Sequence, residues 1–138
     1  MLAAAIALLA TVPAAGIDAH FAMCGAAKRV TCIVDGDTIW LGGTKIRLAD
    51  IDTPETVRPA CPRERAMGQR ATLRMQALLN DGPITLRRDG RDEDRWGRKL
   101  RIVERDGSSL GEVLVGEGLA RRWGEPRVDW CATPAPDS

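Results

Sequence analysis

Five carboxylates that fall within 21 positions of one another are the residues best suited to chemistry: Asp35, Asp37, Asp50, Asp52 and Glu55. Carboxylates that lie close together raise one another's pKa values unless a cation lies among them. Oxygen ligands without neighbouring histidine or cysteine ligands favour Ca²⁺ or Mg²⁺ over zinc or copper. The cluster therefore predicts a site for a hard divalent cation.

Two other interpretations explain less of this cluster. An EF-hand loop that began at Asp35 would need a glutamate at its twelfth position, where Ile46 stands. A solvated turn accounts for the Asp-Gly pair at residues 35–36, because this dipeptide is common in turns. A turn alone does not account for Arg47 or for the acidic run that follows it, so we favour the cation site.

A second group, DRWGR at residues 94–98, places Arg98 behind a glycine at the start of an expected strand. From there its guanidinium could project over a pocket, although an ordinary surface arginine would also fit. Of the 20 basic residues, 17 are arginines, which bind phosphate oxygens through a rigid two-pronged fork. A GC-rich coding bias would give the same excess, and the net charge of +1 excludes a strongly basic binder of nucleic acid.

The helices and strands that must position these side chains are predicted from the spacing of apolar residues, which changes along the chain between the period of a strand and that of a helix. Strand-like runs over residues 28–34, 37–41 and 44–49 predict an antiparallel meander. Apolar residues at helical spacing predict a helix over 63–80, followed by strands over 84–88 and 99–104. Ser109 and Glu112 form a capping box that opens a second, short helix ending at Gly116. This order predicts an α+β, mainly β fold: a five-stranded OB-fold barrel with an inserted helix and a second short helix.

The chain of 138 residues has room for one domain. We expect a signal peptide or apolar leader over 1–15, a linker over 16–27, the OB-fold domain over 28–125 and an irregular tail over 126–138. The leader has the length of a signal-peptide apolar region and is too short to span a bilayer. It lacks the usual basic start, and a frayed apolar helix on a cytosolic protein is the alternative. We predict an exported protein, periplasmic or secreted.

The four cysteines, an even number behind an apolar leader, favour disulfides in an oxidising compartment: Cys24, Cys32, Cys61 and Cys131. Four cysteines allow three pairings, and the sequence does not choose among them. We favour a Cys61–Cys131 bond that ties a loop to the C-terminal tail, which leaves Cys24 with Cys32. A zinc site is disfavoured because there is no CxxC motif and the one histidine, His20, lies near the leader.

Three segments, VDGDTI, IRLADIDTPE and DRWGR, resemble in their order and separation the signature of the thermonuclease (staphylococcal nuclease-like) family. The likeness runs from about Val30 to Trp123. It implies an OB-fold barrel that hydrolyses phosphodiester bonds in DNA and RNA with Ca²⁺ and leaves 3′-phosphate ends.

The resemblance also implies a role for individual residues, carried over position by position. Asp37 and Asp52 match the Ca²⁺ carboxylates, Thr53 matches a backbone carbonyl ligand, and Asp35 matches an acidic position behind them. Glu55 matches the carboxylate proposed to activate water. Arg47 and Arg98 match the two phosphate clamps.

The sequence departs from the family pattern in two places. Trp96 and Trp123 stand where tyrosines are common, and each could stack on a base or belong to the core or its rim. The C-terminal helix of longer members is missing, and we expect the disulfide of Cys131 to replace its packing.

The sequence therefore predicts an exported, Ca²⁺-dependent, sugar-non-specific nuclease, a monomer with DNA and RNA as substrates and no stable protein partner. Five basic residues are expected to attract the polyanion: Arg87, Arg88, Arg95, Lys99 and Arg101. The alternative is a non-catalytic OB-fold module that binds nucleic acid or a protein. Such modules usually lose acidic or arginine positions, whereas every matched position is occupied here. A structural Ca²⁺ domain would leave Arg47 and Arg98 unexplained.

Overall fold

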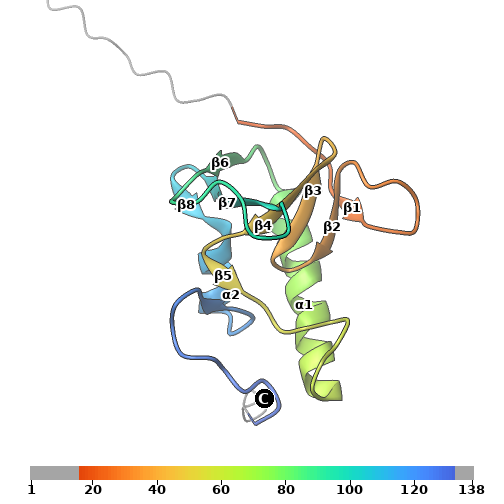
Figure 1. The fold of residues 1–138 in the computed structure, drawn as a ribbon, viewed down its shortest axis with the longest axis vertical. Coiled ribbons are helices and arrows are strands. Elements are labelled where there is room, and N and C mark those ends of the chain that lie inside the picture. The colour runs from red at the N-terminus through yellow and green to blue at the C-terminus, as the bar shows by residue number, and fades with distance from the viewer. Residues whose placement is uncertain (1–15, 133–138) are drawn as a thin grey trace, which may run out of the picture.

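A computed structural model describes residues 16–132 (Figure 1). The expected leader over residues 1–15 and the end of the expected tail, residues 133–138, lie outside the described residues. Within the described part, no helix has both the length and the apolar character needed to cross a membrane.

The main sheet contains the expected meander of β2 (Cys32–Asp35), β3 (Thr38–Leu41) and β4 (Thr44–Leu48), all antiparallel. β7 (Lys99–Arg105) lies parallel to β4, and β6 (Thr85–Arg87) and β8 (Ser108–Ser109) pair with β7. Sequence analysis missed β8 and three other strands, each of two residues, which is too short for a periodic pattern. These are β1 (Ala22–Met23), parallel to β2, and the separate pair β5 (Ile51–Asp52) and β9 (Arg121–Arg122).

Both expected helices are present, within one residue of their predicted bounds. α1 (Pro62–Leu79) runs along one side of the sheet, where it packs against β2 and α2 (Leu110–Gly116) (Figure 1). Ser109 caps α2 by accepting the N–H of Gly111 at 3.1 Å. Glu112 binds Arg122 instead of returning to the Ser109 backbone, so only one half of the expected capping box is seen.

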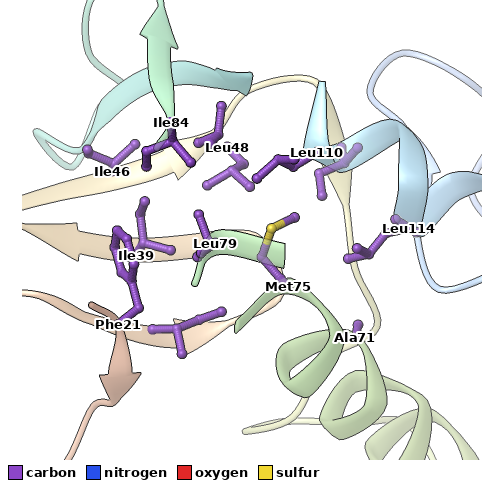
Figure 2. Packing of buried hydrophobic residues seen from close by; sticks show 14 of the residues in the cluster. Phe21, Ile39, Ile46, Leu48, Ala71, Met75, Leu79, Ile84, Leu110 and Leu114 are labelled. Carbon is purple, nitrogen blue, oxygen red and sulfur yellow. The ribbon is translucent and has the colours of Figure 1, made fainter. Parts of the chain in front are cut away.

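The core lies between α1, α2 and the inner face of the sheet (Figure 2). Met75 and Leu79 of α1 point toward Ile39 and Leu48 of the strands, and all four side chains are fully or almost fully buried. Each fully buried apolar side chain of this size contributes about 1.5–3 kcal/mol. This packing fixes the meander against α1 and therefore fixes the loops at the end of the sheet.

The segment over 16–27, expected as a linker, packs into the fold. Phe21 is fully buried, its N–H donates to Asn80 Oδ1 at 2.8 Å, and its carbonyl accepts from Gln76 and Asn80 of the α1 end. Ile17 and Ile84 exchange backbone hydrogen bonds of 2.7 and 3.0 Å, which link the segments that lead into β1 and β6. The described residues thus form an α+β, mainly β fold with two helices.

The structure contains two disulfides, Cys24–Cys32 and Cys61–Cys131. This is the pairing that the sequence analysis favoured. The second bond joins residues 70 positions apart and holds the C-terminal segment at the N-terminal end of α1 (Figure 1).

Candidate active site

The centre of the site is one arginine that lies between two aspartates. Antiparallel pairing of β3 with β4 sets Thr38 opposite Arg47, and this brings the neighbouring Asp37 close to the guanidinium. Arg47 Nη2 lies 3.4 Å from Asp37 Oδ2 and 3.3 Å from Asp52 Oδ1. Arg47 Nη1 donates to the carbonyl oxygens of Leu48 and Ile51, so the β4–β5 bend holds the guanidinium in place. Two carboxylates from distant segments therefore share one cationic group.

Asp37 is further fixed by its neighbours. Its Oδ2 accepts the backbone N–H of Thr53 at 3.0 Å, and its Oδ1 accepts the Thr38 hydroxyl at 3.2 Å. The Asp-Gly pair does begin a turn between β2 and β3, as the turn interpretation expects. Because Asp37 is buried and bonded to Thr53, this turn also brings its carboxylate into the cluster rather than into solvent.

Two more carboxyl groups close to this cluster, Asp35 and Glu55, hold their protons more strongly than usual. Burial, and then the charge of Asp37, raise the pKa of Asp35 to about 7. Partial burial, followed by the charges of Asp37 and Asp52, also raises the pKa of Glu55. A cation bound among these groups would relieve their mutual repulsion.

Arg121 belongs to the cluster, although sequence analysis did not identify it. β5 pairs with β9 so that Asp52 lies opposite Arg121, whose guanidinium is 3.0 Å from Asp52 Oδ2. The same guanidinium donates to the carbonyl of Glu125 at 2.9 Å. The only signal in the sequence is its position two residues before Trp123, because the strand that carries it is too short to predict.

A pocket of about 430 Å³ opens beside the cluster and has both candidate phosphate clamps, Arg47 and Arg98, in its wall. Arg98 immediately precedes β7, in a loop shaped by Asp94, whose Oδ1 accepts the N–H groups of Trp96 and Arg98 at 3.0 and 2.9 Å. The Arg98 side chain forms an ion pair with Asp94 Oδ2 at 2.6 Å. The structure therefore brings Arg98 to the same pocket as Arg47, with its ion pair directed to Asp94 and not to the aspartate cluster.

Trp96 and Trp123 line the same pocket and are 66% and 64% exposed, so neither is a core residue. The Trp123 ring centre lies 5.7 Å from the guanidinium carbons of Arg47 and Arg121. Arg95 stacks over Trp96 at 4.1 Å. Both rings keep much of their surface open to a planar ligand at the rim of the pocket.

Three of the basic residues expected to attract a polyanion are held in ion pairs. Arg87 binds Glu104, Arg101 binds Asp92, and Lys99 binds Asp92 and Glu93. Hydrogen bonds from Lys99 and Arg101 lower the pKa of Asp92 to about 2. Within residues 16–132, only Arg88 and Arg95 of the expected set have no ion pair. Of these two, Arg95 lines the pocket and Arg88 does not.

The donor set near Arg47 fits a hard cation by its chemistry. Asp37 and Asp52 supply carboxylate oxygens, and no histidine or cysteine thiol lies among them. Among the described residues, no three His, Cys, Asp or Glu side chains converge as a ready-made metal cage. A bound Ca²⁺ would therefore draw on the two aspartates, a backbone carbonyl and water, a mixture that Ca²⁺ sites commonly use.

Comparison with known proteins connects this geometry to a family. Residues 45–129 match the family described as "Staphylococcal nuclease homologue". The chain is 42% identical over 94 residues to Endonuclease YncB of Bacillus subtilis (strain 168), covering 64% of this chain and 44% of that protein. It is 34% identical over 97 residues to the Thermonuclease of Staphylococcus hyicus, covering 67% of this chain and 57% of that protein.

The chain thus spans about half the length of the curated relatives that it matches. The family match covers more than half of the chain and includes Arg47, Asp52, Thr53, Glu55 and Arg98. By this match, the chain belongs to the staphylococcal nuclease family.

Proposed function

We propose that this protein is a Ca²⁺-dependent phosphodiesterase that hydrolyses DNA and RNA and leaves 3′-phosphate ends. One observation carries the proposal: Arg47, which lines a pocket together with Arg98, also contacts the carboxylates of Asp37 and Asp52. The names of the relatives, an endonuclease and a thermonuclease, support it.

Asp37, Asp52 and the backbone carbonyl of Thr53 would hold the Ca²⁺. When bound, this cation would stabilise negative charge on the phosphate and lower the pKa of a water molecule. Arg47 and Arg98 would bind the non-bridging phosphate oxygens, on which charge accumulates as water attacks. A positioned donor of this kind is typically worth about 2.7–4 kcal/mol in the transition state. Arginine suits this role because it stays charged and can bind two oxygens at once.

Glu55 would accept the proton of the attacking water. Its raised pKa, caused by partial burial and by Asp37 and Asp52, makes it a stronger base than an ordinary glutamate. The water oxygen forms a new bond to phosphorus, the bond to the 5′ oxygen breaks, and that oxygen takes a proton from solvent. Asp35 would hold the backbone of Asp37 in position without binding the cation itself, since its carboxylate accepts the Asp37 N–H at 3.3 Å.

Trp96 and Trp123 would stack on the bases that flank the bound phosphate. Each stacked base typically contributes about 1–3 kcal/mol and requires no particular base sequence. Exposed rings on the wall of the pocket support this role. Arg88 and Arg95 remain candidates for attracting the polyanion, in a manner that weakens with salt.

We also propose a fold, a cellular compartment and an oligomeric state for this protein. The order β2-β3-β4-β7-β6 and the link between Ile17 and Ile84 support the five-stranded OB-fold barrel expected from sequence. Two disulfides support an exported protein, periplasmic or secreted, because such bonds persist in oxidising compartments. We infer a monomer without a stable protein partner.

The test is incubation of the protein with single-stranded DNA, double-stranded DNA and RNA, in Ca²⁺ and in chelator, followed by analysis of the product ends. We expect cleavage with Ca²⁺, loss of cleavage with chelator, and 3′-phosphate products. Binding that persists in chelator without any cleavage in Ca²⁺ would overturn the proposal and identify a non-catalytic binding module instead.

A further inference from the structure

The loop that carries Glu55 donates two backbone hydrogen bonds, one from each end, to a single carboxylate, that of Glu64. Glu64 Oε2 accepts the backbone N–H of Glu55 at 3.3 Å, and Glu64 Oε1 accepts the backbone N–H of Ala60 at 2.7 Å. The two N–H groups lie five residues apart in the chain. Their shared acceptor therefore fixes the path of the loop between them.

Glu64 is itself held rigidly, because it lies in the first turn of α1. Its own N–H donates to Cys61 Sγ, the cap of the helix, at 3.4 Å. Cys61 is bonded to Cys131, so the start of the helix is tied to the C-terminal segment. The helix dipole favours a carboxylate at this position. The acceptor therefore belongs to a fixed element rather than to the loop.

A second contact presses the start of the loop against the same helix. Gly68 faces the loop so closely that a Cβ added there would lie 2.6 Å from the Pro54 carbonyl oxygen. Glu55 directly follows this proline. The close approach of Pro54 to Gly68 and the hydrogen bond to Glu64 therefore hold the Glu55 backbone against the same helix.

We propose that Glu64 is a positioning residue that orients the Glu55 loop toward the Asp37–Asp52 cluster. The inference rests on the proposed function, in which Glu55 accepts a proton from water. Glu64 acts through the backbone of Glu55 and is not itself a catalytic residue. Small displacements of a reacting group have large effects, since a misplacement of about 1 Å can lower a rate by about 10²-fold.

The experiment uses the full chain with Ca²⁺ and compares Glu64→Ala and Glu64→Gln with wild type. Steady-state cleavage of single-stranded DNA gives kcat and KM, and thermal unfolding gives Tm. We expect Glu64→Ala to lower kcat by about 10–100-fold with KM nearly unchanged. Glu64→Gln retains one amide oxygen and should show a smaller loss. Glu117→Gln is the matched control, because it also removes a carboxylate that contacts α1, through Arg74 at 2.8 Å, and it should leave kcat unchanged.

A double variant separates positioning from a structural role. In a Glu55→Gln background, adding Glu64→Ala should cause little further loss of kcat, because the group that Glu64 positions is already inactive. An equal loss in both backgrounds, or a loss that follows Tm, would overturn the inference. If the wild type cleaves DNA and the Glu64→Ala variant cleaves it equally well, this inference is overturned and the proposed function is not. Absence of wild-type cleavage would overturn the proposed function and the inference with it.

Discussion

Arg47 occupies an unusual position for a residue expected to bind phosphate, because its guanidinium already contacts two carboxylates and two backbone carbonyls. Its side chain is only 12% exposed. Arg98, at 24% exposure, forms one ion pair, with Asp94, lies 5.2 Å from the Trp96 ring centre and lines the pocket. Of the two clamps, Arg98 can therefore be changed with less effect on the fold, and it gives the cleaner test.

We expect Arg98→Lys to lower kcat by about 10²–10³-fold, because an ammonium cannot bind two phosphate oxygens at once. Cleavage rates at saturating substrate measure the effect. Arg87→Lys is the control, since Arg87 also forms a carboxylate ion pair at 2.6 Å, with Glu104, but lies outside the pocket. Similar losses in both variants would show that the effect does not come from the pocket.

Asp35 gives a prediction about stability. Its pKa is about 7 in the folded chain, raised by burial and by Asp37 from an ordinary value of 3.8. The folded state therefore keeps the proton more strongly than the unfolded state. This contribution to stability is fully present below about pH 4 and is lost as the pH rises through 7.

Asp35→Asn removes this dependence because the amide does not ionise. In chelator, the variant should be more stable than wild type at pH 8, by an amount on the order of a few kcal/mol. At pH 4 the two proteins should have nearly equal free energies of unfolding. Urea titrations at both pH values measure the difference, and a gain of the same size at pH 4 would contradict the explanation.

At the scale of elements, the sequence predicts the helices and strands that are long enough for their apolar residues to show a period. The meander and α1 follow from runs of apolar residues with a clear period, and Figure 2 shows those residues in the core. β5 and β9 have two residues each and no period. Their pairing depends on tertiary contacts, which is why Arg121 could not be placed beside Asp52 in advance.

The contact between α1 and the Glu55 loop depends on Gly68. Replacing an exposed helical glycine with alanine usually stabilises a helix by about 1 kcal/mol. At Gly68 the new Cβ would lie 2.6 Å from Pro54 O and 2.7 Å from Thr56 Cγ2, so the loop must move. We expect Gly68→Ala to destabilise the protein by about 1–3 kcal/mol and to lower kcat.

Gly116→Ala in α2 is the control for this prediction. A Cβ at Gly116 would meet nothing within 4 Å. We expect this variant to be unchanged or up to about 1 kcal/mol more stable, with unaltered kcat. Urea unfolding and cleavage assays compare the two. Stabilisation by Gly68→Ala would show that helix propensity outweighs the contact.

At the scale of the whole molecule, the first described segment packs against the C-terminal end of α1, and the last is tied by a disulfide to its N-terminal end. Local motifs identified Asp37, Arg47 and Asp52 from the sequence, and the structure brings them together. Glu64 was not identified, since its role depends on how the loop folds back on α1. Phe21 was assigned to a linker because a single aromatic residue among small ones shows no pattern.

The two disulfides close loops of very different length, with sequence separations of 70 for Cys61–Cys131 and 8 for Cys24–Cys32. A longer loop restricts the unfolded chain more, and the chain-entropy relation gives a difference of about 2 kcal/mol between these two bonds. Two variants, each retaining one disulfide, isolate the effect: Cys24→Ala with Cys32→Ala, and Cys61→Ala with Cys131→Ala. Urea unfolding with and without reductant should show the larger loss on reduction in the variant that retains Cys61–Cys131. Equal losses would contradict the prediction and would mean that the length of the closed loop does not govern the stabilisation.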